Sequence, residues 1–167
     1  MNMKFSIAVL ALAPFFAVAA GNHAGHDMGS MHHDMGGMHS DAEESDSGKA
    51  GDPAKVSRSI EITMDDSMRF TPSQISVKAG ETVRFFVKNS GKVQHEMVIG
   101  TTAELQEHAE MMRKMPSMQH ADANMIALAP SKRGGMVWQF TKPGRYEFAC
   151  LIPEHLEAGM KGVINVE

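Results

Sequence analysis

The sequence has little with which to cross-link itself and no surplus of positive charge. Its single cysteine, Cys150, excludes an internal disulfide, and aromatic residues make up only 6% of the 167 residues. The formal net charge is −4, whereas nucleic-acid-binding domains normally carry a basic surface, so we expect no nucleic-acid partner. The composition also excludes collagen and polytopic membrane proteins. Packing, or a bound metal, must therefore stabilise the fold.

The one long apolar run lies at the N-terminus, over residues 7–20, and it follows Lys4. Ala17-Val18-Ala19 has the small-x-small pattern of a cleavage site, so residues 1–20 are predicted to be a Sec-type signal peptide. A membrane anchor is the alternative, but spanning a bilayer takes about 20 apolar residues. We therefore expect export, most simply to a bacterial periplasm, with no membrane insertion after cleavage.

Methionine and histidine, in contrast, are abundant, with 16 and 9 residues. Five of the histidines fall within residues 23–39, in a segment, 21–55, that is rich in Gly, Ser and Asp and has no hydrophobic periodicity. Such a segment cannot bury enough apolar surface to offset the entropy lost on ordering. Residues 21–55 are therefore predicted to form a disordered tail.

The histidines and methionines of this tail are candidate metal ligands. Imidazole suits Cu(II), Ni(II) and Zn(II), whereas a thioether suits Cu(I). An inert linker, or a zinc or nickel site, is the alternative, but zinc and nickel gain little from thioethers. We predict that the tail binds additional Cu(I) or Cu(II) through His23, His26, Met28, Met31, His32, His33, Met35, Met38 and His39.

Residues 56–167 are long enough for one hydrophobic core, and their apolar pattern has mostly a period of two. Gly- and Pro-containing turns separate the alternating segments. Many short strands punctuated in this way predict an all-β sandwich or barrel. The expected strands cover residues 60–64, 75–77, 83–87, 95–99, 146–150 and 163–166.

One stretch between the expected strands has a helical pattern instead. Thr101-x-x-Glu104 is a capping-box motif, and Leu105 and Ala109 follow at helical spacing. Pro116 should end the run, so we predict an inserted helix of about 13 residues. Residues 118–135 are expected to form a long loop.

The C-terminal segment contains Cys150, His155 and Met160 in the spacing C-x4-H-x4-M, and His95 opens the strand expected over 95–99. Two histidines, one cysteine and a weak axial methionine are the donor set of a blue-copper centre. A strand ending at Cys150 would place the thiolate at the edge of the sandwich, and a short loop could fold His155 and Met160 back over it. These four residues are therefore the predicted metal ligands.

Other roles for these residues remain open at this point. Cys150 could be an inert core residue or a nucleophile with His155 as its base, although no third orienting residue is evident. The same residues could bind zinc, but zinc sites seldom include methionine. Met160 could simply pack in the core.

The pattern Cys-x-Ile-Pro-x-His-x-x-x-Gly-Met-x-Gly, over residues 150–162, resembles the cupredoxins, the family of plastocyanin, azurin and rusticyanin. The resemblance covers residues 60–167, and the ligand spacing looks like that of rusticyanin. It implies a Greek-key β-sandwich with one type 1 copper held by His95, Cys150, His155 and Met160. The tail, the inserted helix and Glu96 resemble one branch more closely, the exported copper-tolerance cupredoxins of the CopI type.

Two positions depart from the family pattern beside the ligands. Glu154 stands where cupredoxins often have Gly, and Glu96 stands where electron carriers often have Asn or Ser. Residues at such positions help to hold the ligand loops together. Two carboxylates beside copper would favour Cu(II), so we expect a lower reduction potential than in a carrier with apolar surroundings.

A second group of soft ligands lies in and after the expected helix. It consists of His108, Met111, Met115, Met118 and His120. One interpretation is that methionine fills gaps between the helix and the sheet. The other is a Cu(I) site beside the blue-copper centre.

The sequence is compatible with three functions. The first is a periplasmic copper-binding protein that contributes to copper tolerance, with a redox-active type 1 centre and a metal-collecting tail. The second is a mobile electron carrier, with Leu151, Ile152, Leu156 and Ala158 as an apolar docking surface around His155. The third is an enzyme, but an oxidase needs further copper sites, so we expect no enzymatic activity. Copper ions are the expected partners, with a periplasmic redox protein or a copper exporter as candidate protein partners.

Overall fold

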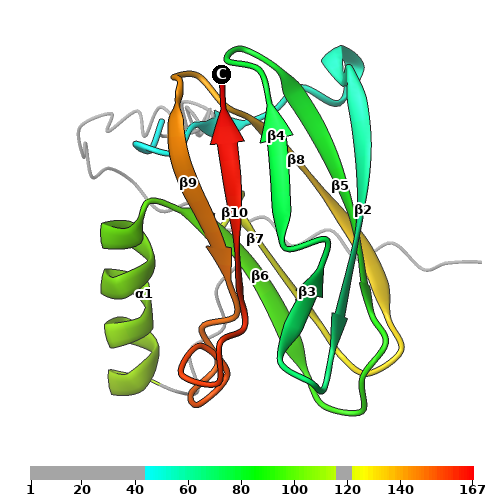
Figure 1. Ribbon diagram of the computed structural model, residues 1–167, viewed down its shortest axis with the longest axis vertical. Coiled ribbons are helices and arrows are strands. Elements are labelled where there is room, and N and C mark those ends of the chain that lie inside the picture. The colour runs from blue at the N-terminus through cyan, green and yellow to red at the C-terminus, as the bar shows by residue number, and fades with distance from the viewer. Residues whose placement is uncertain (1–43, 116–121) are drawn as a thin grey trace, which may run out of the picture. The chain divides into compact units, whose positions relative to one another are not determined.

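The computed structural model of the protein describes residues 44–115 and 122–167. Within them the chain forms two five-stranded sheets, one in the order β1-β8-β5-β2-β3 and the other in the order β4-β10-β9-β6-β7 (Figure 1). The elements are β1 (Lys49–Ala50), the 3-10 helix η1 (Pro53–Lys55), β2 (Arg58–Asp65), β3 (Arg69–Thr71), β4 (Gln74–Val77), β5 (Thr82–Asn89), β6 (His95–Gly100), α1 (Thr102–Lys114), β7 (Met125–Leu128), β8 (Arg133–Gln139), β9 (Gly144–Ala149) and β10 (Lys161–Val166). The predicted signal peptide and the predicted tail ligands lie outside the described residues, as do Met118 and His120.

The hydrophobic core lies between the two sheets. Val83, Phe85 and Val87 on β5 alternate with more exposed neighbours, as a period of two requires, and they join Phe148 of β9 in one buried cluster. Side chains from both sheets contribute to this cluster, which is the arrangement of a sandwich. The predicted all-β sandwich with one inserted helix is confirmed.

Helix α1 covers the outer face of the second sheet. Its capping box is complete, because the Thr101 side chain accepts from the Glu104 N–H while Glu104 Oε2 accepts from the Thr101 N–H. Leu105 and Ala109 pack against Val98 in a second buried cluster. Every residue of β6 is therefore buried, one face by the core and the other by the helix. No helix in the described part of the chain is long and apolar enough to cross a membrane.

The prediction of disorder up to residue 55 is wrong for residues 44–55. Strand β1 pairs with β8, and the Trp138 indole N–H donates to the Ser47 carbonyl oxygen at 3.1 Å. Gly48 has φ +130°, and a Cβ there would lie 2.2 Å from the Gln139 carbonyl oxygen. A two-residue strand has no periodicity of its own, so only its distant partners hold it in place.

The long loop expected over residues 118–135 is wrong in part, because β7 and the start of β8 lie within it. Gly134 and Gly135 follow Arg133 at the start of β8 and have no side chains, which hides the alternation in the sequence. The structure explains the first glycine, since a Cβ at Gly134 would lie 2.6 Å from Ile126 Cδ1 of β7. Glycine at this position therefore allows β7 to approach β8.

The corrected boundary predicts that residues 44–55 stabilise the domain. A chain that begins at Val56 should unfold with a free energy lower by about 1–3 kcal/mol than one that begins at Glu44, because the buried Trp138 N–H loses its acceptor. Urea unfolding, followed by the fluorescence of the one tryptophan and by circular dichroism, measures the difference. Equal unfolding free energies for the two chains would contradict the prediction.

Candidate metal centre

Three predicted ligands converge at one end of the second sheet. One ligand atom from each of His95, Cys150 and His155 lies within 4.8 Å of the others. Cys150 Sγ is 3.2 Å from His155 Nδ1, and the two imidazole ring centroids are 5.0 Å apart. His95 is the first residue of β6 and Cys150 follows directly on β9, the neighbouring strand. In the part of the chain that the structure describes, no other set of three His, Cys, Asp or Glu residues is arranged to hold a metal ion.

The loop over residues 150–160 carries His155 and is closed by strand pairing. Lys161 of β10 pairs with Ala149 of β9, which brings Met160 beside Cys150. The Cys150 N–H donates to the Met160 carbonyl oxygen at 3.1 Å, and the Met160 N–H donates to the His155 carbonyl oxygen at 3.0 Å. Met160 is fully buried in this loop, as a fourth ligand would be, and its role as a ligand stays a prediction.

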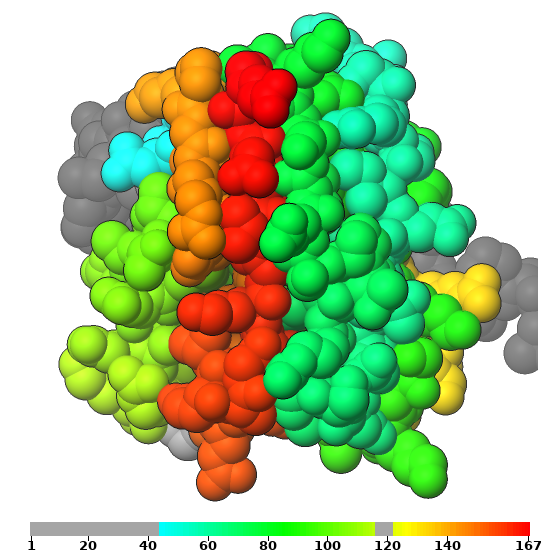
Figure 2. All heavy atoms as spheres, viewed as in Figure 1, coloured from blue at the N-terminus to red at the C-terminus, as the bar shows by residue number. Residues whose placement is uncertain are grey.

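Neighbouring elements hold the outside of this loop. Arg69 of β3 donates to the Ala158 carbonyl oxygen at 2.9 Å, and Arg113 of α1 lies 3.9 Å from Glu157. Figure 2 shows the loop at the surface between α1 and β3. The ligands are therefore supported on both sides by regular secondary structure.

Asp66 determines which ring nitrogen of His95 carries a proton. Asp66 Oδ1 lies 3.1 Å from His95 Nε2, and a carboxylate can only accept a hydrogen bond, so Nε2 carries the proton. A hydrogen bond from the Lys92 backbone N–H, assisted by His95, holds the pKa of Asp66 below its usual value, which keeps it ionised. His95 Nδ1 is buried with no hydrogen-bond partner and has a free lone pair. This orphaned atom is what a metal ligand requires, so the site fits a bound metal.

Sequence reasoning missed Asp66 and Asn89, which shape the backbone before His95. The fully buried Asn89 side chain donates to the carbonyl oxygens of Val93 and Leu128 and accepts from the Gly91 N–H. A Cβ at Gly91 would lie 2.0 Å from Asp66 Oδ1, so glycine makes room for the carboxylate. Asp66 is 29 residues from His95, and no local pattern could have linked the two.

The two glutamates that depart from the family pattern have different environments. Glu96 is 3% exposed, and its Oε1 accepts a hydrogen bond from the Leu151 N–H at 2.9 Å, directly after Cys150. It therefore ties β6 to the ligand loop. Glu154 is exposed and has φ +75°, a left-handed conformation that favours glycine.

Burial controls the charge of the metal-free site. It raises the pKa of the Cys150 thiol to about 12, and together with the nearby His95 it lowers the pKa of His155. Without a metal the Cys150 thiol therefore keeps its proton at pH 7, and metal binding must displace that proton. A thiolate and two imidazoles with a nearby thioether suit copper, because the donors are soft or intermediate.

The remaining predicted residues are separate from this site or are not described. His108 and Met111 lie on α1, and Met115 caps its C-terminus. His108 is not part of the His95–Cys150–His155 group. The histidines and methionines predicted in the tail lie among residues 1–43, outside the described part.

Residues 54–167 match the family model for copper-binding proteins of the plastocyanin/azurin family. The chain is 50% identical to the copper-resistant cuproprotein CopI of Rubrivivax gelatinosus over 159 residues, which cover 95% of this chain and 94% of that protein. It is 38% identical to the copper-resistant cuproprotein CopI of Pseudomonas aeruginosa, with 72% of this chain and 82% of that protein covered. Dithionite-reduced auracyanin from Roseiflexus castenholzii has a similar fold, with a TM-score of 0.58, 25% identity, and coverage of 67% of this chain and 98% of that one.

Replacing Asp66 by Asn should weaken copper binding by roughly 10- to 100-fold, the usual effect of losing such a partner. The asparagine amide can donate to His95 Nε2 and so favour the tautomer whose Nδ1 is protonated. Asp65→Asn is the matched control, because the Asp65 side chain accepts from Ser67 and not from His95. Competition titration with a copper chelator measures both affinities. Equal losses of copper affinity in the two variants would show that copper binding by His95 does not depend on its hydrogen bond to Asp66.

Proposed function

The chain belongs to the plastocyanin/azurin family of copper-binding proteins, and we propose that it is a periplasmic member that contributes to copper tolerance. The observation that carries this proposal is the His95–Cys150–His155 group, in which His95 and Cys150 are buried and His95 Nδ1 is orphaned. Two relatives that are named copper-resistant cuproproteins support it, because they match over most of their lengths.

Copper bound at this site would supply a one-electron couple between Cu(I) and Cu(II). The chain's own residues keep the donor atoms in place: Asp66 orients His95, Glu96 holds the backbone after Cys150, and β9–β10 pairing fixes the loop. A site held in this way changes little in geometry between the two oxidation states. The centre is therefore suited to redox cycling as well as to tight binding.

The tail supports a role in copper handling. Its predicted histidines and methionines offer donors for both oxidation states, and the signal peptide predicted before it supports export. An electron carrier has no need for a metal-collecting segment. We propose that the tail gathers copper in the periplasm and that the cupredoxin domain holds one copper tightly.

The alternative, a mobile electron carrier, would need an apolar docking surface around His155. Leu151 cannot contribute, because it is 3% exposed and packs in the cluster beneath α1. Ile152 and Leu156 are half-buried, and Glu154 and Glu157 are exposed in the same loop. The surface around His155 is thus more acidic and less apolar than the sequence suggested, which favours copper handling.

Copper tolerance of a strain that lacks the gene tests this function. Complementation with Cys150→Ser should fail to restore tolerance, and the purified variant should lose the visible thiolate-to-Cu(II) band. Deletion of residues 21–43 should also lower tolerance while it leaves that band, and reduction by a small-molecule donor, intact. Immunoblots of the periplasmic fraction control for abundance. Full tolerance with the deleted tail, together with failed electron transfer in Cys150→Ser, would favour the carrier instead.

The reduction potential tests the role of the two glutamates. Glu96→Gln should raise the potential by tens of millivolts, because the amide oxygen can still accept from the Leu151 N–H while the negative charge is lost. Glu154→Gly should raise it less, because the Glu154 side chain is exposed and screened by solvent. Redox titration of the copper-loaded variants measures both shifts. An unchanged potential in both variants would contradict the expectation.

A further inference from the structure

His108 and Met111 of helix α1 and its C-cap residue Met115 lie outside the buried clusters that pack the helix on the sheet. Leu105 and Ala109 fill the contact with the sheet. His108 and Met111 are only half-buried, Met115 is 43% exposed, and none of these three belongs to the buried clusters of the described residues. Gap filling therefore does not account for them.

The three side chains share one stripe of the helix surface. At 3.6 residues per turn, positions 108, 111 and 115 fall within an arc of about 60°. Successive members are three and four residues apart, so their side chains are neighbours on the helix surface. These three residues, the α1 stripe, line a hollow of about 500 Å³.

The chemistry of the α1 stripe suits a soft cation. Two thioethers and an imidazole are donors that favour Cu(I), whereas zinc and nickel gain little from thioethers. Three carboxylates, from Glu104, Glu107 and Glu110, line the same hollow with a single ammonium, from Lys114. The excess of negative charge attracts cations to the hollow.

We propose that His108, Met111 and Met115 form a Cu(I)-binding site on the outer surface of α1. The site deepens the proposed function and rests on it, because Cu(I) is here cargo that the protein handles and not the copper of the His95–Cys150–His155 centre.

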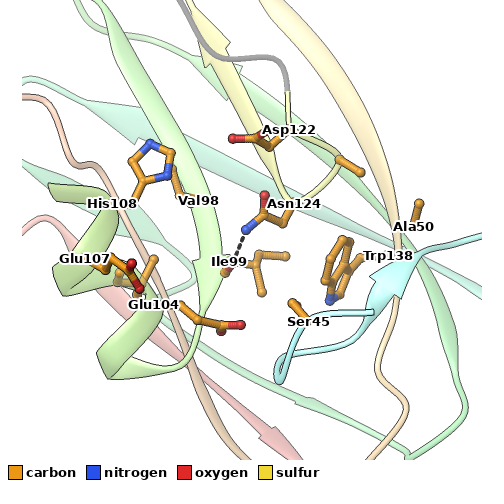
Figure 3. Close-up of a pocket in the computed structure, with 12 residues that line it drawn as sticks. Ser45, Ala50, Val98, Ile99, Glu104, Glu107, His108, Asp122, Asn124 and Trp138 are labelled. Carbon is orange, nitrogen blue, oxygen red and sulfur yellow. Dashed lines mark hydrogen bonds between the residues drawn. The ribbon is translucent and has the colours of Figure 1, made fainter. Parts of the chain in front are cut away.

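The position of α1 supports this role. Near its N-terminus, Glu104 Oε1 accepts from the Asp46 N–H, in the segment that follows the tail, and Figure 3 shows Glu104 and His108 extending from the helix at a pocket that Ser45 also lines. Near its C-terminus, Arg113 lies beside Glu157 of the ligand loop. The segment with β1 and the ligand loop lie at opposite ends of the domain in Figure 1, and α1, about 20 Å long, runs between them. The α1 stripe therefore lies between the segment at Asp46, which follows the tail in the sequence, and the ligand loop.

The test uses the full mature chain with Cu(I) under anaerobic, reducing conditions and with Ag(I) as a redox-inert substitute. The double variant Met111→Leu/Met115→Leu removes both sulfur atoms and keeps the bulk of the side chains. Met112→Leu is the matched control, because Met112 is on the same helix but does not line the hollow. Competition with a chromophoric Cu(I) chelator counts the bound ions, and NMR of ¹³C-methyl-labelled methionines locates bound Ag(I).

The double variant should bind one Cu(I) fewer than the wild type, or bind one at least tenfold more weakly, while Met112→Leu binds as the wild type does. The Met111 and Met115 methyl signals should shift together on addition of Ag(I), and the visible band of the Cu(II)-loaded centre should be the same in all three proteins. An unchanged count together with unshifted methyl signals would overturn the site. That result would leave the proposed function intact, whereas full copper tolerance without the tail would overturn the function but not the measured Cu(I) site.

Discussion

The antiparallel pairing of β9 with β10 is the constraint on which the rest of the site depends. Because Ala149 pairs with Lys161, the eleven residues of the 150–160 loop must leave and re-enter adjacent strands. Cys150 and Met160 are thereby brought side by side, and His155 is folded back between them by backbone hydrogen bonds. The pairing of β6 with β9 then adds His95 from the neighbouring strand. A metal-binding geometry thus follows from sheet register, before any metal is bound.

The helix outside the two sheets contacts the 150–160 loop as well as the core. Helix α1 covers the outer face of β6 and β9, so Leu151 packs inward and the backbone after Cys150 is buried with Glu96. The same helix contacts the segment after the tail at one end and the ligand loop at the other. The inserted helix therefore stabilises the loop that carries the predicted ligands. Its outer surface faces away from the sheet.

Local patterns in the sequence were reliable where the structure depends on local physics. The alternation at 83–87 and the capping box at Thr101 were enough to predict β5 and α1, because side-chain period and helix capping act over a few residues. They failed at residues 44–55 and at Gly134. At both places the backbone conformation is stabilised by a partner strand, which the local sequence does not encode.

The sequence by itself was enough to predict the donor set, since the spacing of Cys150, His155 and Met160 and the position of His95 at a strand start are properties of one chain read in order. Only the tertiary structure decided which nitrogen of His95 is free, because that depends on Asp66, which reaches it from the turn after β2. It also decided that Leu151 is buried and that the α1 stripe is only partly buried. Ligand identity is local chemistry, whereas protonation and exposure depend on contacts between residues far apart in the chain.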